Sequence, residues 1–288
     1  MVVWRFEAIG TRWEIETADP LPPDGRAAVQ AVTEHFDRRW SRFRPDSDVS
    51  RLRAAGGGFA SDDAAPMLDA YRELSAATGG AVNPLVGESL EALGYDAAYS
   101  LVAGEPRPAP DDWTTRLEWS ADALTMRGPA TIDVGALGKG RLVDLVQRAL
   151  ADVPGTVVVD AGGDLSVRDG AIRVGLEHPF DASRAIGVAT VGDQALCASA
   201  TNRRAWGAGF HHVLDARTGT PVVAWTAAWA LADEAMTADA VATALFFDGG
   251  PELAARWGVH WVRLSSDGRA QRSPGCPIEI FTPTRPDA

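Results

Sequence analysis

The chain has 288 residues, of which 46% are hydrophobic and 23% charged, as is usual for globular proteins. Its formal net charge of −12 argues against a nucleic-acid partner, since no basic surface is available to hold a phosphate backbone. The same charge allows a small anionic ligand, because a local site can be positive inside an acidic protein.

The first half of the chain predicts two strands followed by long helices. Alternation over Val2–Thr17, broken at Ile9-Gly10-Thr11, is typical of two strands joined by a tight turn. Apolar residues at helical spacing predict helices over Arg26–Trp40 and Pro66–Thr78. The proline-rich segment Gly104–Asp112 predicts an exposed loop.

The second half predicts mostly strands. The pattern predicts that Pro129–Val134 is a strand that leads into a helix. It also predicts a hairpin in which Asp164–Arg168 and Ala171–Leu176 are joined by an Asp-Gly turn. Met236–Phe247 is an alanine-rich helix, and Trp257–Leu264 opens a closing hairpin. Further strands are predicted over Gly155–Asp160, Ala185–Val191, Ala195–Ser199 and Thr226–Leu231. This order predicts an α+β fold of mixed antiparallel sheets and packed helices rather than a repeated βαβ pattern.

The expected location is the cytoplasm. The first residues lack the basic region and long apolar stretch of a signal peptide, and no run of about 18 apolar residues could span a membrane. Cys197 and Cys276 are too few for a framework of several disulfides, and a single bridge between them stays open.

The run Thr131–Leu145, TIDVGALGKGRLVDL, is the most informative motif. It predicts a strand ending at Asp133, a glycine-spaced turn, and Lys139 at the start of a helix. The unpaired N–H groups and positive dipole of a helix N-terminus favour a phosphate. The spacing is neither GxGxxG nor GxxxxGKS, so a plain Rossmann or Walker site is excluded.

A second motif has metal-binding chemistry. Asp239 and Thr243 lie four residues apart and share one face of the predicted helix. Carboxylate and hydroxyl oxygens are hard ligands of the kind that Mg²⁺ takes, together with waters and substrate phosphates. The alternative is a solvated Asp and a Thr bonded to its own helix.

Two further segments carry polar residues. In VVVDAGGDL a buried strand ends in an Asp before two glycines, which allows close backbone approach or simply a tight turn. Ser199 and two arginines follow Cys197, and His212 and Asp215 come further on. A His near an Asp could act as the base in a proton transfer, or both could be ordinary strand residues.

Taken in order, these blocks resemble the ApbE family of FAD:protein FMN transferases over nearly the whole chain. The matching blocks are GT at 10–11, SRFRPDSDVSRL at 41–52, TGGAVNPLV at 78–86, DVGALGKGRLVD at 133–144, DAGGDL at 160–165, HHVLDARTG at 211–219 and ADAVATAL at 238–245.

The resemblance implies an enzyme with a single α+β domain related to the T-fold, here residues 1–283 with a tail at 284–288. It implies Mg²⁺-dependent cleavage of FAD, transfer of FMN to a Thr or Ser hydroxyl of an acceptor protein, and release of AMP. Two alternatives remain: an FAD pyrophosphatase that gives FMN and AMP, and a non-catalytic flavin-binding protein.

The resemblance also implies roles for individual residues. The metal would be held by the side chains of Asp239 and Thr243 and by the carbonyl of Ala136, with His212 assisting proton transfer and Asp215 orienting nearby groups. The positions that match the family's FAD pocket are Ile9, Gly10, Thr11, Phe43, Ala81, Val82, Asn83, Asp133, Lys139 and Ser199.

The chain departs from the family pattern mainly in the flavin pocket. Ile9 stands where the family usually has Met, Phe43 where Tyr is common, and Asn83 where Asp is usual. The metal residues are kept. Five tryptophans are further candidates for stacking on a flavin, although most tryptophans are core residues; they are Trp4, Trp13, Trp40, Trp206 and Trp225.

Overall fold

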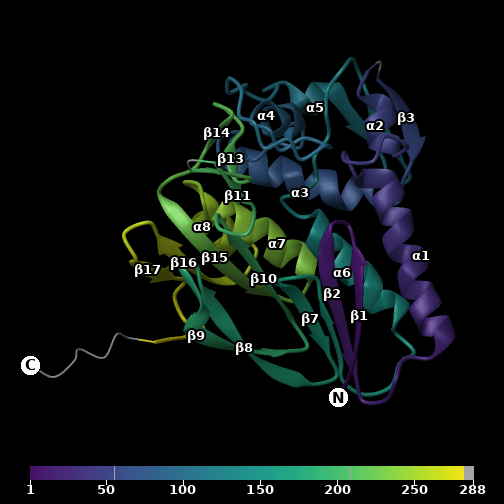
Figure 1. The fold of residues 1–288 in the computed structure, drawn as a ribbon, viewed down its shortest axis with the longest axis vertical. Helices are drawn as coiled ribbons and strands as arrows, with labels where there is room; N and C mark the ends of the chain where they lie inside the picture. Colours follow the sequence, from purple (N-terminus) through teal and green to yellow (C-terminus); the bar gives the residue numbers. More distant parts are fainter. Residues whose placement is uncertain (55, 208, 282–288) are drawn as a thin grey trace, which may run out of the picture.

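In the computed structural model, which describes residues 1–54, 56–207 and 209–281, an eight-stranded antiparallel sheet forms the base of the molecule (Figure 1). Its strands follow the order β1-β2-β6-β7-β10-β15-β16-β17. They are β1 (Val2–Ala8), β2 (Thr11–Thr17), β6 (Val157–Asp160), β7 (Asp164–Arg168), β10 (Ala195–Ala200), β15 (Trp225–Ala232), β16 (His260–Ser265) and β17 (Ala270–Arg272). The predicted N-terminal strand pair and the closing hairpin are thereby confirmed.

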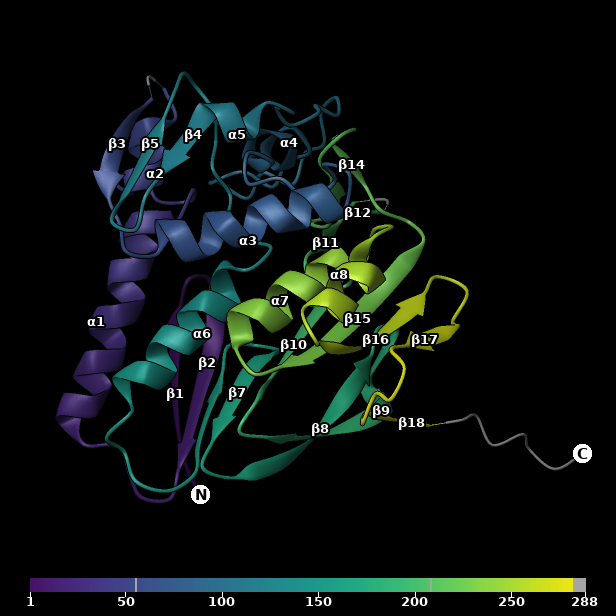
Figure 2. The same ribbon diagram turned by 180° about the vertical axis from the view of Figure 1, so that it is seen from behind.

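The sheet is buried on both faces, and the alternation along β15 shows how. Ala228 and Ala230 face a core shared with the helices, whereas Trp229 and Leu231 face a second core. The helical layer is α6 (Gly138–Ala149), α7 (Ala235–Ala244) and α8 (Gly250–Arg256), seen in front of the sheet in Figure 2. The opposite layer is a three-stranded sheet of β18 (Glu279–Ile280), β9 (Asp181–Gly192) and β8 (Ala171–His178).

The predicted hairpin between Asp164–Arg168 and Ala171–Leu176 is wrong. Both edges of β7 are already hydrogen-bonded, to β6 on one side and to β10 on the other, so β8 has no free edge of β7 to join. The chain turns at Asp169, which has a φ of 54°, and enters the smaller sheet, where β8 pairs with β9. The Asp-Gly signal therefore marks a turn between two sheets.

Residues 23–126 build most of the upper part of the molecule in Figure 1, with α1 running down one side. Its elements are α1 (Pro23–Trp40), α2 (Asp48–Leu52), β3 (Gly57–Ala60), α3 (Ala64–Ala77), α4 (Gly87–Ala92), α5 (Trp113–Arg116), β4 (Leu117–Trp119) and β5 (Ala123–Met126). The predicted helices over Arg26–Trp40 and Pro66–Thr78 are confirmed by α1 and α3, and residues 101–110 form the expected loop, most of it exposed.

The predicted strand over Pro129–Val134 is also wrong. Residues 128–134 have no strand partner, although Ala130 and Ile132 are fully buried. The Asp133 N–H donates to the carbonyl of Pro84 rather than to a strand. The apolar run thus reflects burial under neighbouring segments, and α6 begins after it at Gly138, close to the predicted helix start.

The remaining strands are short. They are β11 (Ala205–Trp206) with β12 (Phe210–His211), and β13 (Leu214–Asp215) with β14 (Thr220–Pro221). All strand pairs in the described part of the chain are antiparallel, which confirms the α+β class. Both cysteines are free thiols. The proposed tail at 284–288 lies outside the described residues, and the domain range 1–283 stays a prediction.

The two helices α6 and α7 approach each other at Gly140. A Cβ placed on Gly140 would lie 2.2 Å from the carbonyl oxygen of Ala235 and 2.8 Å from Cβ of Asp239, so only glycine fits. Asp144, one turn later on α6, caps α7: its two oxygens accept the N–H groups of Ala235 and Met236 at 2.8 and 2.9 Å. These contacts fix α7, which carries Asp239 and Thr243, against α6.

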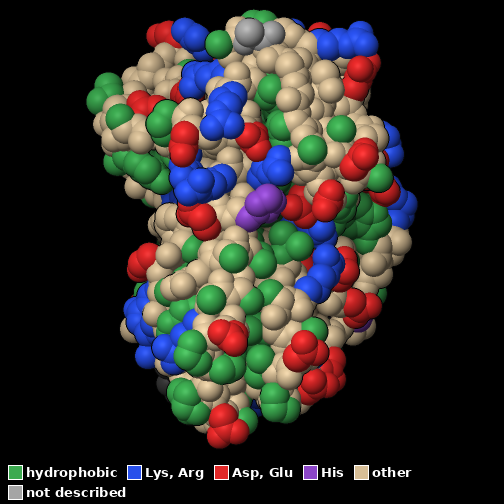
Figure 3. Space-filling model, turned by 90° about the vertical axis from the view of Figure 1, so that its right-hand side faces the viewer, with side chains coloured by type: hydrophobic (Ala, Val, Ile, Leu, Met, Phe, Trp, Pro, Cys, Tyr) green, Lys and Arg blue, Asp and Glu red, His purple; other side chains and the backbone are tan. Residues whose placement is uncertain are grey.

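Charged side chains are mixed on the face drawn in Figure 3. Acidic and basic groups alternate across the middle of this face, around one histidine. No large area of a single sign covers it, so this face lacks the basic surface that a nucleic acid requires.

Replacing Gly140 by Ala should lower the free energy of unfolding by about 1–3 kcal/mol, because backbone atoms of Ala235 would have to move. Urea unfolding measures the change. Gly25→Ala in α1 is the matched control: its Cβ would make only ordinary contacts, the nearest at 3.6 Å, and Ala favours helix, so stability should not fall. Equal stability of the Gly140→Ala variant and the wild type would contradict the described packing.

Candidate active site

A cavity of about 920 Å³ lies where the upper part of the molecule meets the large sheet. Its walls come from the β1–β2 turn, the end of α1, α3, the segment before α6, β10 and α7. This volume suits a cofactor-sized ligand. All the residues predicted for the site from the sequence line it except Asp215; they are Ile9, Gly10, Thr11, Phe43, Ala81, Val82, Asn83, Asp133, Ala136, Lys139, Ser199, His212, Asp239 and Thr243.

Lys139 and the buried Asp239 line the cavity, and a second buried acid, Asp164, pairs with Lys139 without lining it. Asp164 is completely buried, and its Oδ2 lies 2.9 Å from Nζ of Lys139. Asp239 is 3% exposed and accepts the Gly140 N–H on Oδ2 at 2.9 Å. Burial, reinforced by the Asp164 carboxylate, raises the pKa of Asp239 well above its usual range, although Lys139 opposes the shift.

Lys139 keeps its charge in this wall. Burial lowers the pKa of Lys139, but the carboxylates of Asp164 and Asp239 outweigh it, and the net shift is upward. Lys139 is in the first turn of α6, where the helix dipole is also positive. The cavity therefore holds the positive Lys139 side chain and the start of α6 next to Asp239. A further cation there would favour the ionised form of Asp239.

The segment Asp133–Ala136 is held in place from two sides. The hydroxyl of Tyr71 donates to the carbonyl of Asp133 at 3.1 Å and accepts the N–H of Ala136 at 3.3 Å. The Asp133 carboxylate accepts the N–H of Gly135 at 2.7 Å and pairs with Nε of Arg42 at 2.5 Å. The predicted metal-ligating carbonyl at Ala136 thus belongs to a rigid turn.

His212 lies on the cavity wall as a neutral base. Its Nδ1 is shielded from solvent and has no hydrogen-bond partner among the described residues. Burial, and then the nearby charge of Arg204, lowers the pKa of His212 to about 3. Asp215 lies outside the cavity wall, with its carboxylate bonded to the guanidinium and N–H of Arg217, so the structure does not bring it to the cavity with His212.

Aromatic residues form another wall. Phe43 and Tyr99 stack with ring centroids 5.4 Å apart, and Tyr95 stacks on Trp206 at 5.6 Å. All four line the cavity. Of the tryptophans considered for stacking, Trp40 and Trp206 line it, whereas Trp4, Trp13 and Trp225 are packed elsewhere in the fold.

The β1–β2 turn and the 81–83 segment are shaped by the backbone. Ile9 has a φ of 48° and Gly10 one of 69°, an unusual conformation for a β-branched residue such as Ile. Asn83 uses its side chain for structure, donating to Pro110 O and accepting the N–H of Leu85, both at 2.8 Å. Its amide is therefore already engaged on two sides.

Sequence reasoning missed three residues that organise the site. Arg42 and Tyr71 fix the 133–136 segment, and Asp164 pairs with Lys139. For Asp164 there was a signal, because an acid follows the two glycines in DAGGD. Nothing local marks Tyr71, which reads as a core position of an amphipathic helix, or singles out Arg42 among its arginine neighbours.

The chain belongs to the ApbE family, whose family model matches residues 9–260. A curated FAD:protein FMN transferase from Rhodobacter capsulatus is 29% identical over 300 residues, which cover 93% of this chain and 56% of the relative. Another of the same name, from Klebsiella pneumoniae (strain 342), is 33% identical over 96 residues, 32% of this chain and 30% of the relative. The chain spans about half the length, or less, of these curated relatives.

Solved structures share the fold. An ApbE protein from Thermotoga maritima superposes with a TM-score of 0.81 at 20% identity, covering 95% of this chain and 97% of its own. The flavin transferase ApbE from Vibrio cholerae gives 0.76 at 20% identity with the same coverage. In the described part of the chain, no helix has the length and apolar character needed to cross a membrane.

Replacing His212 by Gln should flatten the dependence of stability on pH. The ordinary histidine pKa is near 6.5 and that of folded His212 about 3, so between these values the unfolded chain binds more protons and stability falls as the pH falls. Between pH 7 and pH 5 the wild type should lose about 2 kcal/mol of its free energy of unfolding through this group, and the variant should not lose it. Urea unfolding at both pH values measures the difference.

The exposed histidine on α1 supplies the control, since His35→Gln removes an imidazole without touching the cavity. Parallel stability profiles for wild type and His212→Gln would show that His212 is not buried as a neutral group.

Proposed function

We propose that this protein transfers FMN from FAD to a Thr or Ser hydroxyl of an acceptor protein, in a Mg²⁺-dependent reaction that releases AMP. The observation that carries the proposal is that Ala136, Asp239 and Thr243 line the same cavity as Lys139 and the start of α6. The curated relatives named FAD:protein FMN transferase support the same activity.

The residues present fit a magnesium ion. A carboxylate, a hydroxyl and a backbone carbonyl are hard oxygen donors, and Mg²⁺ usually binds a few protein groups together with substrate phosphates. The buried carboxyl of Asp239, whose pKa is raised by burial, would gain a second cation beside Lys139. In the described residues, no group of three His, Cys, Asp or Glu side chains could hold a metal, so the hydroxyl and carbonyl are needed.

When bound, Mg²⁺ would neutralise the charge that develops on the leaving phosphate. Lys139 and the positive dipole at the start of α6 would hold the pyrophosphate of FAD in the same cavity. The remaining cavity residues would bind the rest of FAD; they are Ile9, Gly10, Thr11, Phe43, Ala81, Val82, Asn83, Asp133 and Ser199.

The transfer step needs a proton acceptor, and His212 has the required form. The acceptor hydroxyl oxygen would bond to the phosphorus of the FMN phosphate, and the bond from that phosphorus to the oxygen shared with AMP would break. The hydroxyl proton would pass to the neutral imidazole of His212. Asp215, held by Arg217 away from the cavity, would act only indirectly.

One assay separates transfer from its alternatives. The protein is incubated with FAD, Mg²⁺ and a candidate acceptor protein, and the products are run on a denaturing gel and a reversed-phase column. A fluorescent band at the position of the acceptor protein on the gel, together with AMP on the column, supports transfer. Free FMN and AMP without the band would indicate a pyrophosphatase, and intact bound FAD a flavin-binding protein.

Asp239→Asn and Thr243→Val should each lower metal affinity and Mg²⁺-dependent turnover. Each removes a proposed oxygen ligand while nearly preserving shape, and the loss should exceed about 100-fold, more than an outer partner of a metal contributes. Binding of Mn²⁺, followed by electron paramagnetic resonance, gives a readout independent of turnover.

Thr237→Val is the matched control, because Thr237 is a turn and a half from Thr243 on α7 and does not line the cavity. It should bind Mn²⁺ like the wild type. Unchanged Mn²⁺ binding by the folded Asp239→Asn variant would remove Asp239 from the metal site.

A further inference from the structure

Arg42 is a buried arginine on the wall of the cavity. It follows α1 and is only 5% exposed. Its Nε pairs with Asp133 at 2.5 Å, and its Nη1 donates to the carbonyl of Tyr95 at 2.8 Å. Two of its three nitrogens are thus committed to protein acceptors, and the guanidinium is held in one orientation.

The third nitrogen, Nη2, has no acceptor. It is shielded from solvent and makes no hydrogen bond with any of the described residues. A buried donor without a partner is costly and rare in folded proteins. Since Arg42 lines the cavity, a ligand bound there is the nearest source of the acceptor that the described residues do not supply.

The charge of Arg42 is already balanced. The Asp133 carboxylate contacts its Nε, and a carboxylate oxygen of Glu91, an acid that also pairs with Arg53, lies 3.8 Å from Nη1. A phosphate at Nη2 would add a further negative charge near these two acids. A neutral acceptor, such as a ring carbonyl or ring nitrogen, fits this electrostatic setting better.

The surroundings of Arg42 suit a flat ring. The guanidinium carbon lies 4.1 Å from the ring centroid of Phe43 and 5.0 Å from that of Tyr95, and both rings line the cavity. Aromatic side chains next to a polar donor are the usual environment of a bound heteroaromatic ring.

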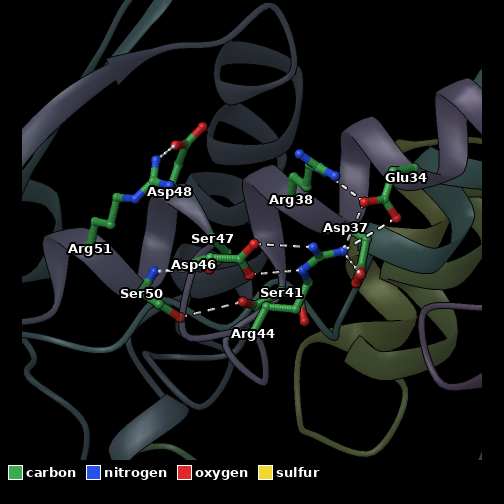
Figure 4. Close-up of polar contacts among 10 residues, drawn as sticks. All are labelled: Glu34, Asp37, Arg38, Ser41, Arg44, Asp46, Ser47, Asp48, Ser50 and Arg51. Carbon is green, nitrogen blue, oxygen red and sulfur yellow. Dashed lines mark hydrogen bonds and ion pairs between the residues drawn. The ribbon is translucent and has the colours of Figure 1, made fainter.

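The neighbouring Arg44 shows the contrast (Figure 4). Its guanidinium faces three acids, with hydrogen bonds of 2.9 Å to Asp37, 3.1 Å to Asp46 and 3.2 Å to Glu34. These bonds raise the pKa of Arg44. Arg44 is thus engaged by the acidic surface near the end of α1, whereas Arg42 keeps a free donor inside.

We propose that Nη2 of Arg42 donates a hydrogen bond to a neutral acceptor on a heteroaromatic ring of the ligand, and so selects for that ring. The inference rests on the proposed function in taking FAD as the ligand. FAD carries two such rings, the carbonyl-bearing isoalloxazine and the nitrogen-bearing adenine, and the test distinguishes them.

The test compares ligand fragments bound by the full-length protein. Arg42→Lys keeps a cation beside Asp133 but removes Nη2. Dissociation constants are measured by calorimetry for riboflavin, adenosine and Mg²⁺-pyrophosphate. We expect the variant to bind one of the two ring compounds about 10-fold more weakly, the size of one charged hydrogen bond, and to change pyrophosphate binding by less than this, since a cation is kept beside Asp133. Arg38→Lys, a change in the exposed Arg38–Glu34 pair on α1, is the matched control and should bind all three like the wild type.

A second measurement needs no variant. If riboflavin is the affected compound, the wild type should bind its 2-thio or 4-thio analogue more weakly than riboflavin, because sulfur is a poor hydrogen-bond acceptor. If adenosine is the affected compound, the wild type should bind a deaza analogue, which lacks one ring nitrogen, more weakly than adenosine. Loss of pyrophosphate binding alone, or ring binding that neither change affects, would overturn the role of Arg42 and leave flavin transfer standing. Failure of the wild type to bind FAD would instead overturn the proposed function.

Discussion

The close contact between α6 and α7 at Gly140 is the constraint on which the rest of the site depends. Because glycine alone fits there, the Asp239 side chain reaches the N–H of Gly140, one residue from Lys139. Asp144 then holds the start of α7 through two backbone N–H groups. Residues about a hundred positions apart in the sequence are joined in this way into one cavity wall.

The electrostatics of that wall follow from the packing. Asp164 and Asp239 are buried beside a single lysine, so the cluster has one more carboxyl group than it has cations. Burial and the second acid raise the pKa of Asp239 well above its usual range, which means that ionising it requires further positive charge. A divalent cation coordinated by oxygen ligands would supply that charge, which is why the cluster supports the proposed magnesium site. An overall charge of −12 does not oppose it, because local charges dominate inside a cavity.

The opposite end of the cavity is built differently. There the walls are aromatic and come from segments around Phe43, Tyr95, Tyr99 and Trp206, joined by the buried guanidinium of Arg42. Phe43, one of the positions at which the sequence departs from the family pattern, lies in this wall, whereas Ile9 and Asn83 lie in segments shaped by the backbone. The residues proposed to bind phosphate and metal therefore lie where α6 and α7 pack closely against each other.

The sequence by itself determined the strong local patterns: the amphipathic helices α1 and α3, the first strand pair, the α+β class and the DVGALGKG and ADAVATAL motifs. These depend on side-chain periodicity and turn residues, which act over a few positions. Tertiary structure alone decided that β8 leaves β7 for a second sheet, because β7 has no free edge, and that residues 130–134 are largely buried without strand pairing. It also decided the partners of Lys139 and Arg42, which lie 25 and 91 residues away at Asp164 and Asp133. Such pairs are set by which segments pack together, and no local pattern encodes that.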